Sequence, residues 1–116
     1  MQLFAYGTLI DRALLESKIG HAAGGSPQPA RLDGYRRTHD ARRGYPWVTP
    51  DESQCVIGVV WSGLSDDDMR LLDAYEGVDA DPPEYWRRQL QVRITGSDEA
   101  ITVEVYVGNP AAFAGE

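Results

Sequence analysis

Residues 3–11 read Leu-Phe-Ala-Tyr-Gly-Thr-Leu-Ile-Asp, a short apolar run that stops at Gly7-Thr8. A run of this length that ends in a turn signal is typical of a buried strand. Asp11 can then act as the N-cap of a helix, and Gly20 stands where such a helix would end. The sequence therefore predicts a strand, a tight turn and a helix at its start.

The turn at Tyr6-Gly7-Thr8-Leu9 is the first place where we expect chemistry. Where a strand passes into a helix, several backbone N–H groups are left without partners, and the helix dipole favours an anion beside them. Gly7 lets a ligand approach the backbone closely. A carboxylate is the expected ligand, and the alternative is a turn in which Gly7 serves geometry alone.

The middle of the chain predicts further strands. We expect a strand over Arg31–Thr38 and a loop over Arg42–Pro50. The continuous apolar run Cys55–Trp61 is typical of a central strand buried on both faces, with Cys55 in the core. Gly58 inside this run indicates a bulge or the close approach of another group.

A second helix is predicted after Ser65. Its hydroxyl can cap the helix, and the three aspartates that follow favour the positive end of the dipole. Met69, Leu72 and Tyr75 recur at helical spacing, and Gly77 stands where a left-handed C-cap is needed.

Two alternating runs close the chain, over Tyr85–Ile94 and Ile101–Val107, with a turn at Gly96-Ser97-Asp98. This pattern predicts an antiparallel hairpin. The order strand, helix, strands, helix, hairpin predicts a single α+β domain over residues 1–116, or a small barrel with helices on its flank.

Glu76 is the candidate for acid–base chemistry. It follows Leu72 by four residues and Met69 by seven, so it lies on the buried face of the predicted helix. Burial and the negative end of the helix dipole both raise the pKa of a carboxyl group in that position. The alternative is a structural ion pair between Glu76 and Arg87 or Arg88.

Composition excludes several classes of protein. The 116 residues carry 18 acidic and 11 basic side chains, a net charge of −7, which disfavours nucleic acid or an anionic membrane as partner. A single cysteine excludes an internal disulfide, and no apolar run is long enough to span a bilayer. We expect a cytoplasmic protein without a signal peptide, and favour a monomer.

The sequence points to no cofactor or metal. There is no P-loop and no dinucleotide-binding fingerprint. The aspartates at 66–68 lack the ligand spacing of a calcium loop and are read as a helix start. The arginines are expected mostly to pair with the surplus carboxylates, and the alternative is that one or two of them meet an acidic metabolite.

Several short motifs, in one order along the chain, resemble the gamma-glutamylcyclotransferase-like family. They are Phe4-Ala5-Tyr6-Gly7-Thr8-Leu9, Tyr45-Pro46, Val56-Ile57-Gly58-Val59-Val60, Leu72-Asp73-Ala74-Tyr75-Glu76-Gly77, Tyr85-Trp86-Arg87-Arg88 and Val105-Tyr106-Val107. The chain looks most similar to the gamma-glutamylamine cyclotransferase-like branch. The resemblance implies a small mixed β-barrel with flanking helices and a central cavity.

The resemblance also implies roles for residues. Tyr6, Gly7, Thr8 and Leu9 would form the cavity floor and bind the α-carboxylate end of the substrate, Tyr85 would line the cavity, and Glu76 would be the general acid and base. The implied reaction converts a γ-glutamyl amide into 5-oxoproline and a free amine, with no cofactor.

Two other functions stay open at this stage. One is a non-catalytic module that binds a small acidic metabolite. The other is a protein-interaction domain whose exposed aromatic side chains, Trp47 and Trp86, meet a partner. A catalytic Glu76 argues against the first, because a carboxylate in a carboxylate-binding pocket lowers affinity unless it takes part in chemistry.

Overall fold

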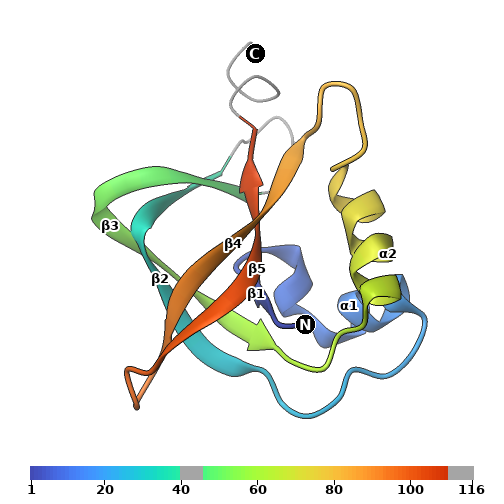
Figure 1. Ribbon diagram of the computed structural model, residues 1–116, viewed down its shortest axis with the longest axis horizontal. Coiled ribbons are helices and arrows are strands. Elements are labelled where there is room, and N and C mark those ends of the chain that lie inside the picture. The colour runs from blue at the N-terminus through green and yellow to red at the C-terminus, as the bar shows by residue number, and fades with distance from the viewer. Residues whose placement is uncertain (40–45, 110–116) are drawn as a thin grey trace.

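The computed structural model describes residues 1–39 and 46–109. The elements are β1 (Leu3–Ala5), the short 3₁₀ helix η1 (Thr8–Ile10), α1 (Arg12–Ile19), β2 (Gln28–His39), β3 (Pro46–Trp61), α2 (Asp66–Glu76), β4 (Tyr85–Ile94) and β5 (Ala100–Gly108). The strands close into a barrel in the order β1-β3-β2-β4-β5. Both helices lie on one side of it (Figure 1). The predicted small mixed barrel with flanking helices is therefore confirmed.

The barrel is built from two hairpins joined by the first strand. β2 pairs with β3 and β4 pairs with β5, both antiparallel. β1 runs antiparallel to β3 and meets β5 in a short parallel pairing of Leu3 with Glu104. On the other side, β2 joins β4 at Ala30 and Arg31. The predicted strand at 31–38 and the C-terminal hairpin are confirmed.

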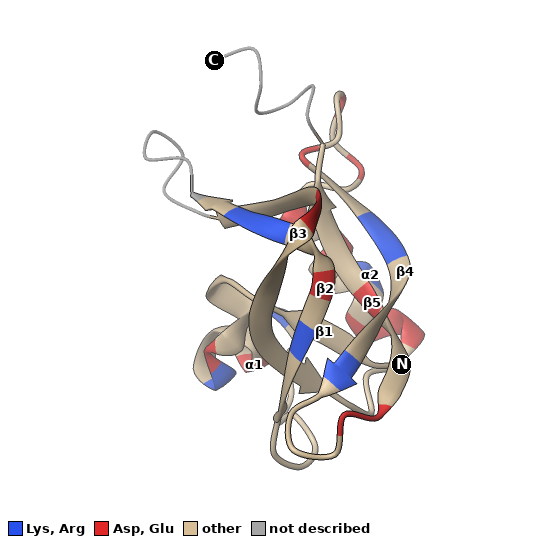
Figure 2. Cartoon of the chain, turned by 90° about the vertical axis from the view of Figure 1, so that its left-hand side faces the viewer, with Lys and Arg blue, Asp and Glu red and all other residues tan. Residues whose placement is uncertain are grey.

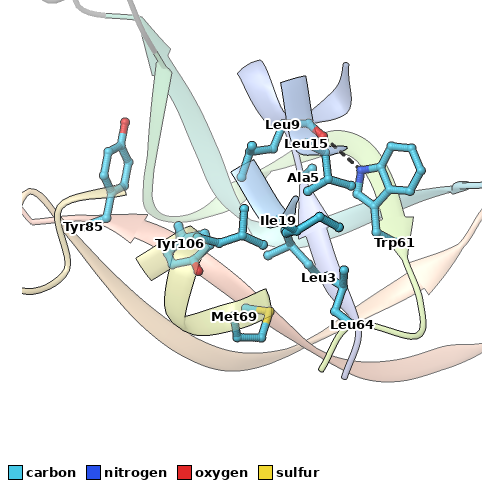
Figure 3. Close-up of a cluster of buried hydrophobic side chains, with 11 residues drawn as sticks. Leu3, Ala5, Leu9, Leu15, Ile19, Trp61, Leu64, Met69, Tyr85 and Tyr106 are labelled. Carbon is cyan, nitrogen blue, oxygen red and sulfur yellow. Dashed lines mark hydrogen bonds between the residues drawn. The ribbon is translucent and has the colours of Figure 1, made fainter. Parts of the chain in front are cut away.

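The four residues Leu3–Tyr6 are buried and divide between two hydrophobic clusters. Leu3 and Ala5 pack with the apolar residues of α1, α2 and the end of β3 (Figure 3). Phe4 and Tyr6 point into a second cluster, which is rich in valine and fills the barrel. Because successive strand residues face opposite sides, one short strand anchors both cores.

The helix ends follow the predicted caps. The Asp11 carboxylate accepts the N–H groups of Ala13 at 2.9 Å and Leu14 at 3.3 Å, and Gly20 ends α1 in the left-handed conformation. Ser65 and Asp68 form a reciprocal capping box, and Gly77 ends α2 with φ of 71°. Local signals therefore fix where both helices begin and end.

Gly58 in β3 is a point of close approach, one of the two predicted alternatives. A Cβ atom there would lie 2.3 Å from the Ala5 carbonyl oxygen and 2.8 Å from the Phe4 ring. Glycine is therefore required for β1 to lie against β3.

Several predictions in the middle of the chain are wrong. The predicted loop at 42–50 is strand from Pro46 onward, and residues 42–45 lie outside the described residues. Burial in β3 alternates instead of covering both faces, so Ile57 is 67% exposed and Cys55 is also exposed. A continuous apolar run cannot reveal this, because the inner and outer residues of a barrel strand are both aliphatic here.

The aromatic side chains also differ from expectation. Tyr75 is exposed, although it continues the helical spacing of Met69 and Leu72. Trp47 and Trp86, expected to be exposed, are half-buried. Trp47 packs against Gly108, and the Arg88 guanidinium lies 5.0 Å from the Trp86 ring.

Basic and acidic residues are interspersed along the barrel strands (Figure 2). Arg31 contacts Asp33 at 2.9 Å and Asp98 at 3.1 Å, which fits the expected pairing of arginines with surplus acids. None of the helices in the described part of the chain is long and apolar enough to cross a bilayer.

Candidate active site

A cavity of about 230 Å³ lies beside β1 on the side of the barrel that faces the last turn of α2. It is lined by residues 3–9, Pro46, Tyr75, Glu76, Glu84, Tyr85 and Tyr106. All six predicted site residues, Tyr6, Gly7, Thr8, Leu9, Glu76 and Tyr85, are in this lining. Three separate segments of the chain therefore bring the predicted residues to one place.

The turn after β1 forms one wall. A Cβ atom on Gly7 would lie 2.8 Å from the Pro46 ring, so packing as well as turn geometry favours glycine. Thr8 Oγ1 lies 3.0 Å from the Tyr75 hydroxyl, and the Trp61 indole N–H donates to the Leu9 carbonyl at 2.9 Å (Figure 3). The turn is thereby fixed to α2 and to β3.

The expectation that the dipole of the following helix acts at this turn is wrong. The turn leads into the single 3₁₀ turn η1, and α1 begins only at Arg12. The side chain of Asp11 accepts hydrogen bonds from two of the first N–H groups of α1. The dipole of α1 is therefore not available to an anion at Gly7.

Glu76 is the last residue of α2 and is partly buried. Burial raises the pKa of its carboxyl group to about 7, and the negative charge of Glu84 adds to the effect. The direction and the main cause match the prediction, whereas the contribution of Glu84 was not predicted. A carboxyl group with this pKa exchanges protons readily near neutral pH.

The alternative ion pair of Glu76 is not seen. Arg87 Nε lies 3.5 Å from the Asp73 carboxylate and 3.6 Å from that of Glu104. Among residues 1–39 and 46–109, no ion pair to Glu76 is found. Arg87 is therefore paired with Asp73, which lies about one turn before Glu76 on α2, and not with Glu76.

The carboxylate of Asp73 also accepts a hydrogen bond from the Tyr106 hydroxyl, at 2.8 Å to its Oδ1. The hydroxyl of Tyr6 donates to the main-chain carbonyl of Tyr106. Burial raises the pKa of both tyrosines, so their hydroxyl groups stay protonated. Together these bonds join β1, α2 and β5 beneath the cavity.

Tyr85 is buried, and its hydroxyl donates to the Pro46 carbonyl at 2.7 Å. This bond joins the start of β4 to the start of β3 at the cavity wall. The hydroxyl is therefore already engaged as a donor, and Tyr85 contributes to the cavity wall.

The family model for gamma-glutamyl cyclotransferase, AIG2-like proteins matches residues 3–115. The chain belongs to this family. It is 34% identical over 109 residues to AIG2-like protein C of Arabidopsis thaliana, a match that covers 90% of this chain and 57% of that protein. The chain thus spans somewhat over half the length of this curated relative.

Solved structures agree with this family membership in their fold. A solution structure of an Arabidopsis thaliana protein superposes with a TM-score of 0.79 at 27% identity, over 97% of this chain and 73% of the other. A gamma-glutamyl cyclotransferase superposes with a TM-score of 0.75 at 18% identity, over 94% of this chain and 66% of the other. At that identity the second likeness concerns the fold alone.

Seven lining residues of this AIG2-like chain were not predicted as site residues: Leu3, Phe4, Ala5, Pro46, Tyr75, Glu84 and Tyr106. Tyr106 pairs with Arg87 in the hairpin, so strand register could have placed it on the α2 side. Glu84 precedes the first strand residue and follows a loop, where periodicity gives no signal. Within the described ranges, no cluster of His, Cys, Asp and Glu suited to a metal is present.

Proposed function

We propose that the protein is a cyclotransferase that converts a γ-glutamyl amide, either a γ-glutamylamine or a γ-glutamyl amino acid, into 5-oxoproline and a free amine. One observation carries the proposal. In a member of the gamma-glutamyl cyclotransferase, AIG2-like family, a carboxyl group with a pKa of about 7 lines a cavity beside the turn at Tyr6–Leu9.

The reaction is an intramolecular acyl transfer. The α-amino nitrogen of the glutamyl unit attacks its own γ-carbonyl carbon, and a C–N bond forms as the carbonyl oxygen becomes an oxyanion. Glu76 accepts the proton that the attacking nitrogen loses. The oxyanion then collapses, the original amide C–N bond breaks, and Glu76 returns the proton to the leaving amine.

The raised pKa of Glu76 suits both proton transfers. An α-amino group has a pKa of about 8, whereas an ordinary glutamate has one of about 4.3, a mismatch of nearly four units. A pKa of about 7 for Glu76 reduces the mismatch to about one unit. The carboxylate is then basic enough to take the proton and the acid strong enough to give it back.

Positioning supplies the rest of the proposed catalysis. Holding the flexible glutamyl chain in a ring-closing pose can contribute roughly 7–11 kcal/mol to lowering the barrier. In this proposal the backbone N–H groups at Gly7 and Thr8 bind the α-carboxylate, while Leu9 and Tyr85 form the walls. This role rests on their shared place in the cavity lining.

The test is release of 5-oxoproline from a panel of γ-glutamyl amines and dipeptides, with Glu76→Gln measured alongside. We expect release by the wild type and a loss of at least about a hundredfold in the variant, the usual effect of removing an acid–base group. Binding without release from any compound would favour the metabolite-binding function. Release that survives the substitution would keep the reaction and remove Glu76 from it.

A further inference from the structure

A second carboxylate, that of Glu84, lines the same cavity as Glu76. Glu84 lies just before β4, eight positions after Glu76, and the loop between them brings the two together. The negative charge of Glu84 acts on the Glu76 carboxyl group, which places the two groups within electrostatic range of each other.

The main chain of Glu84 is held from both sides. Its N–H donates to the Gly77 carbonyl at 3.0 Å, and its carbonyl accepts the N–H of Asn109 at 3.0 Å. Asn109 is buried, and its side chain donates to the Pro83 carbonyl at 2.7 Å. The residue that carries the second carboxylate is thus fixed between the end of α2 and the end of β5.

The side chain of Glu84 is positioned by the C-cap of α2. Its Cβ, Cγ and Cδ atoms lie 3.2–3.3 Å from the position that a Cβ atom on Gly77 would occupy. A side chain at residue 77 would therefore push Glu84 away. The same glycine that ends the helix in a left-handed conformation leaves room for Glu84 beside Glu76.

Two carboxylates that line one small cavity suit a cationic ligand between them, because a positive charge there lowers the energy of both carboxylates. Every γ-glutamyl compound carries such a group, the α-ammonium. In the proposed reaction this group must also lie against Glu76, since that residue takes its proton. The leaving amine, by contrast, differs from one γ-glutamyl compound to another.

We propose that Glu84 binds the α-ammonium group of the substrate and holds it opposite Glu76. The inference rests on the proposed function and extends it by naming a substrate-binding residue. The ammonium donates one N–H to each carboxylate. Glu76 first accepts one proton from the ammonium, and the neutral nitrogen then attacks the γ-carbonyl carbon. Glu76 gives that proton to the leaving nitrogen as the original amide C–N bond breaks, takes the second proton from the new ring nitrogen and passes it to the released amine, which departs as an ammonium.

The test compares two ligands that differ only in this group: γ-glutamyl-propylamine and glutaryl-propylamine, which lacks the α-amino group. Binding is measured by calorimetry in the Glu76→Gln background, so that no turnover occurs. Adding Glu84→Gln should weaken binding of the γ-glutamyl compound by about tenfold to a hundredfold, the usual effect of losing a charged hydrogen bond. Binding of the glutaryl compound should stay the same or improve.

Glu52→Gln is the matched control, because it removes an exposed carboxylate on β3 by the same substitution. It should leave binding of both ligands unchanged. Unchanged binding of the glutaryl compound also shows that the Glu84 variant is folded.

Two results would overturn the assignment of Glu84 while leaving the proposed function in place. One is an equal loss of affinity for both ligands in the Glu84→Gln variant, which would make Glu84 a structural residue. The other is unchanged affinity for both ligands in the Glu84→Gln variant, although the wild-type protein releases 5-oxoproline. Absence of both binding and release in the wild type would instead overturn the proposed function, and the assignment with it.

Discussion

The two sides of β1 face different surroundings. Towards the barrel axis, Phe4 and Tyr6 meet a cluster made largely of valines from β3, β4 and β5, with Ala30 and Leu32 from β2. Towards the helices, Leu3 and Ala5 meet a cluster that includes Trp61, Tyr85 and Tyr106 and borders the cavity. Phe4 and Tyr6 also reach the cavity lining, but the valine-rich barrel interior chiefly stabilises the fold, whereas the side facing the helices carries the Glu76 carboxyl group.

This contrast predicts that stability and activity respond to different substitutions. The largest effect should come from the barrel interior, at Phe4, which is 1% exposed. Phe4→Ala should lower the free energy of unfolding by about 3–5 kcal/mol, because it leaves a cavity among the valines. Denaturant unfolding measures the loss. A loss below about 1 kcal/mol would mean that the interior is not the main stabilising core.

Glu76→Gln should show the opposite behaviour, with activity lost and stability kept. The folded-state pKa of about 7 lies above the ordinary value of 4.5, so the ionised carboxylate costs folding free energy. That cost begins as the pH rises above about 4.5 and is complete above about 7, where it amounts to roughly 1–3 kcal/mol. At pH 8 the variant should therefore be as stable as the wild type or more stable.

The pH profile of kcat/KM sharpens the same point. The base form of Glu76 accepts the proton, so activity should rise with pH and level off above about 7. Thermal unfolding of wild type and Glu76→Gln across pH 4–8 supplies the matching stability curve. A variant that is less stable than the wild type at pH 8 would contradict the assignment of a raised pKa.

Gly58→Ala tests the contact on which both clusters depend. A Cβ atom would meet the Ala5 carbonyl at 2.3 Å, so β1 must move away from β3. We expect a loss of about 1–3 kcal/mol in unfolding free energy, together with reduced activity, since β1 carries the turn at Gly7. Gly24→Ala, where the new Cβ meets nothing within 4 Å, is the control.

The smallest expected effect is at His21, an exposed residue outside both clusters. Its Nε2 lies 2.7 Å from Asp68, and this hydrogen bond raises the pKa of the imidazole. The contribution to stability is present below the ordinary histidine pKa of about 6.5 and is lost as the pH rises through the higher folded value. His21→Ala should therefore lower the melting temperature more at pH 5.5 than at pH 8.5. An equal decrease at both pH values would contradict this linkage.

Much of the fold and of the candidate site could be predicted from the sequence, because the signals that specify them are local. Capping by Asp11 and Ser65, the left-handed glycines and the alternation in β4 and β5 are properties of neighbouring residues. Helical spacing was also enough to place Glu76 on the buried side of α2. The ordered motifs then indicated the family, and with it the place of Tyr85 in the cavity lining.

What the sequence missed depends on contacts between distant segments. Exposure of Cys55 follows from which face of β3 meets the barrel, and an aliphatic run does not contain that information. The proximity of Glu84 to Glu76 depends on a loop folding back onto Gly77. Tyr75 has the right spacing for burial, but the cavity lies beside it, so its ring stays accessible.

The hydrogen bond from Tyr6 to the carbonyl of Tyr106 joins residues separated by 100 positions along the chain. The pairing of Leu3 with Glu104 spans a similar separation. During synthesis, the first strand therefore cannot pair with the last strand until the last strand has been made, so the barrel and its cavity form only then. Contacts of such high sequence separation slow folding and leave apolar segments exposed in the meantime. The cavity is thus among the last features of the protein to exist.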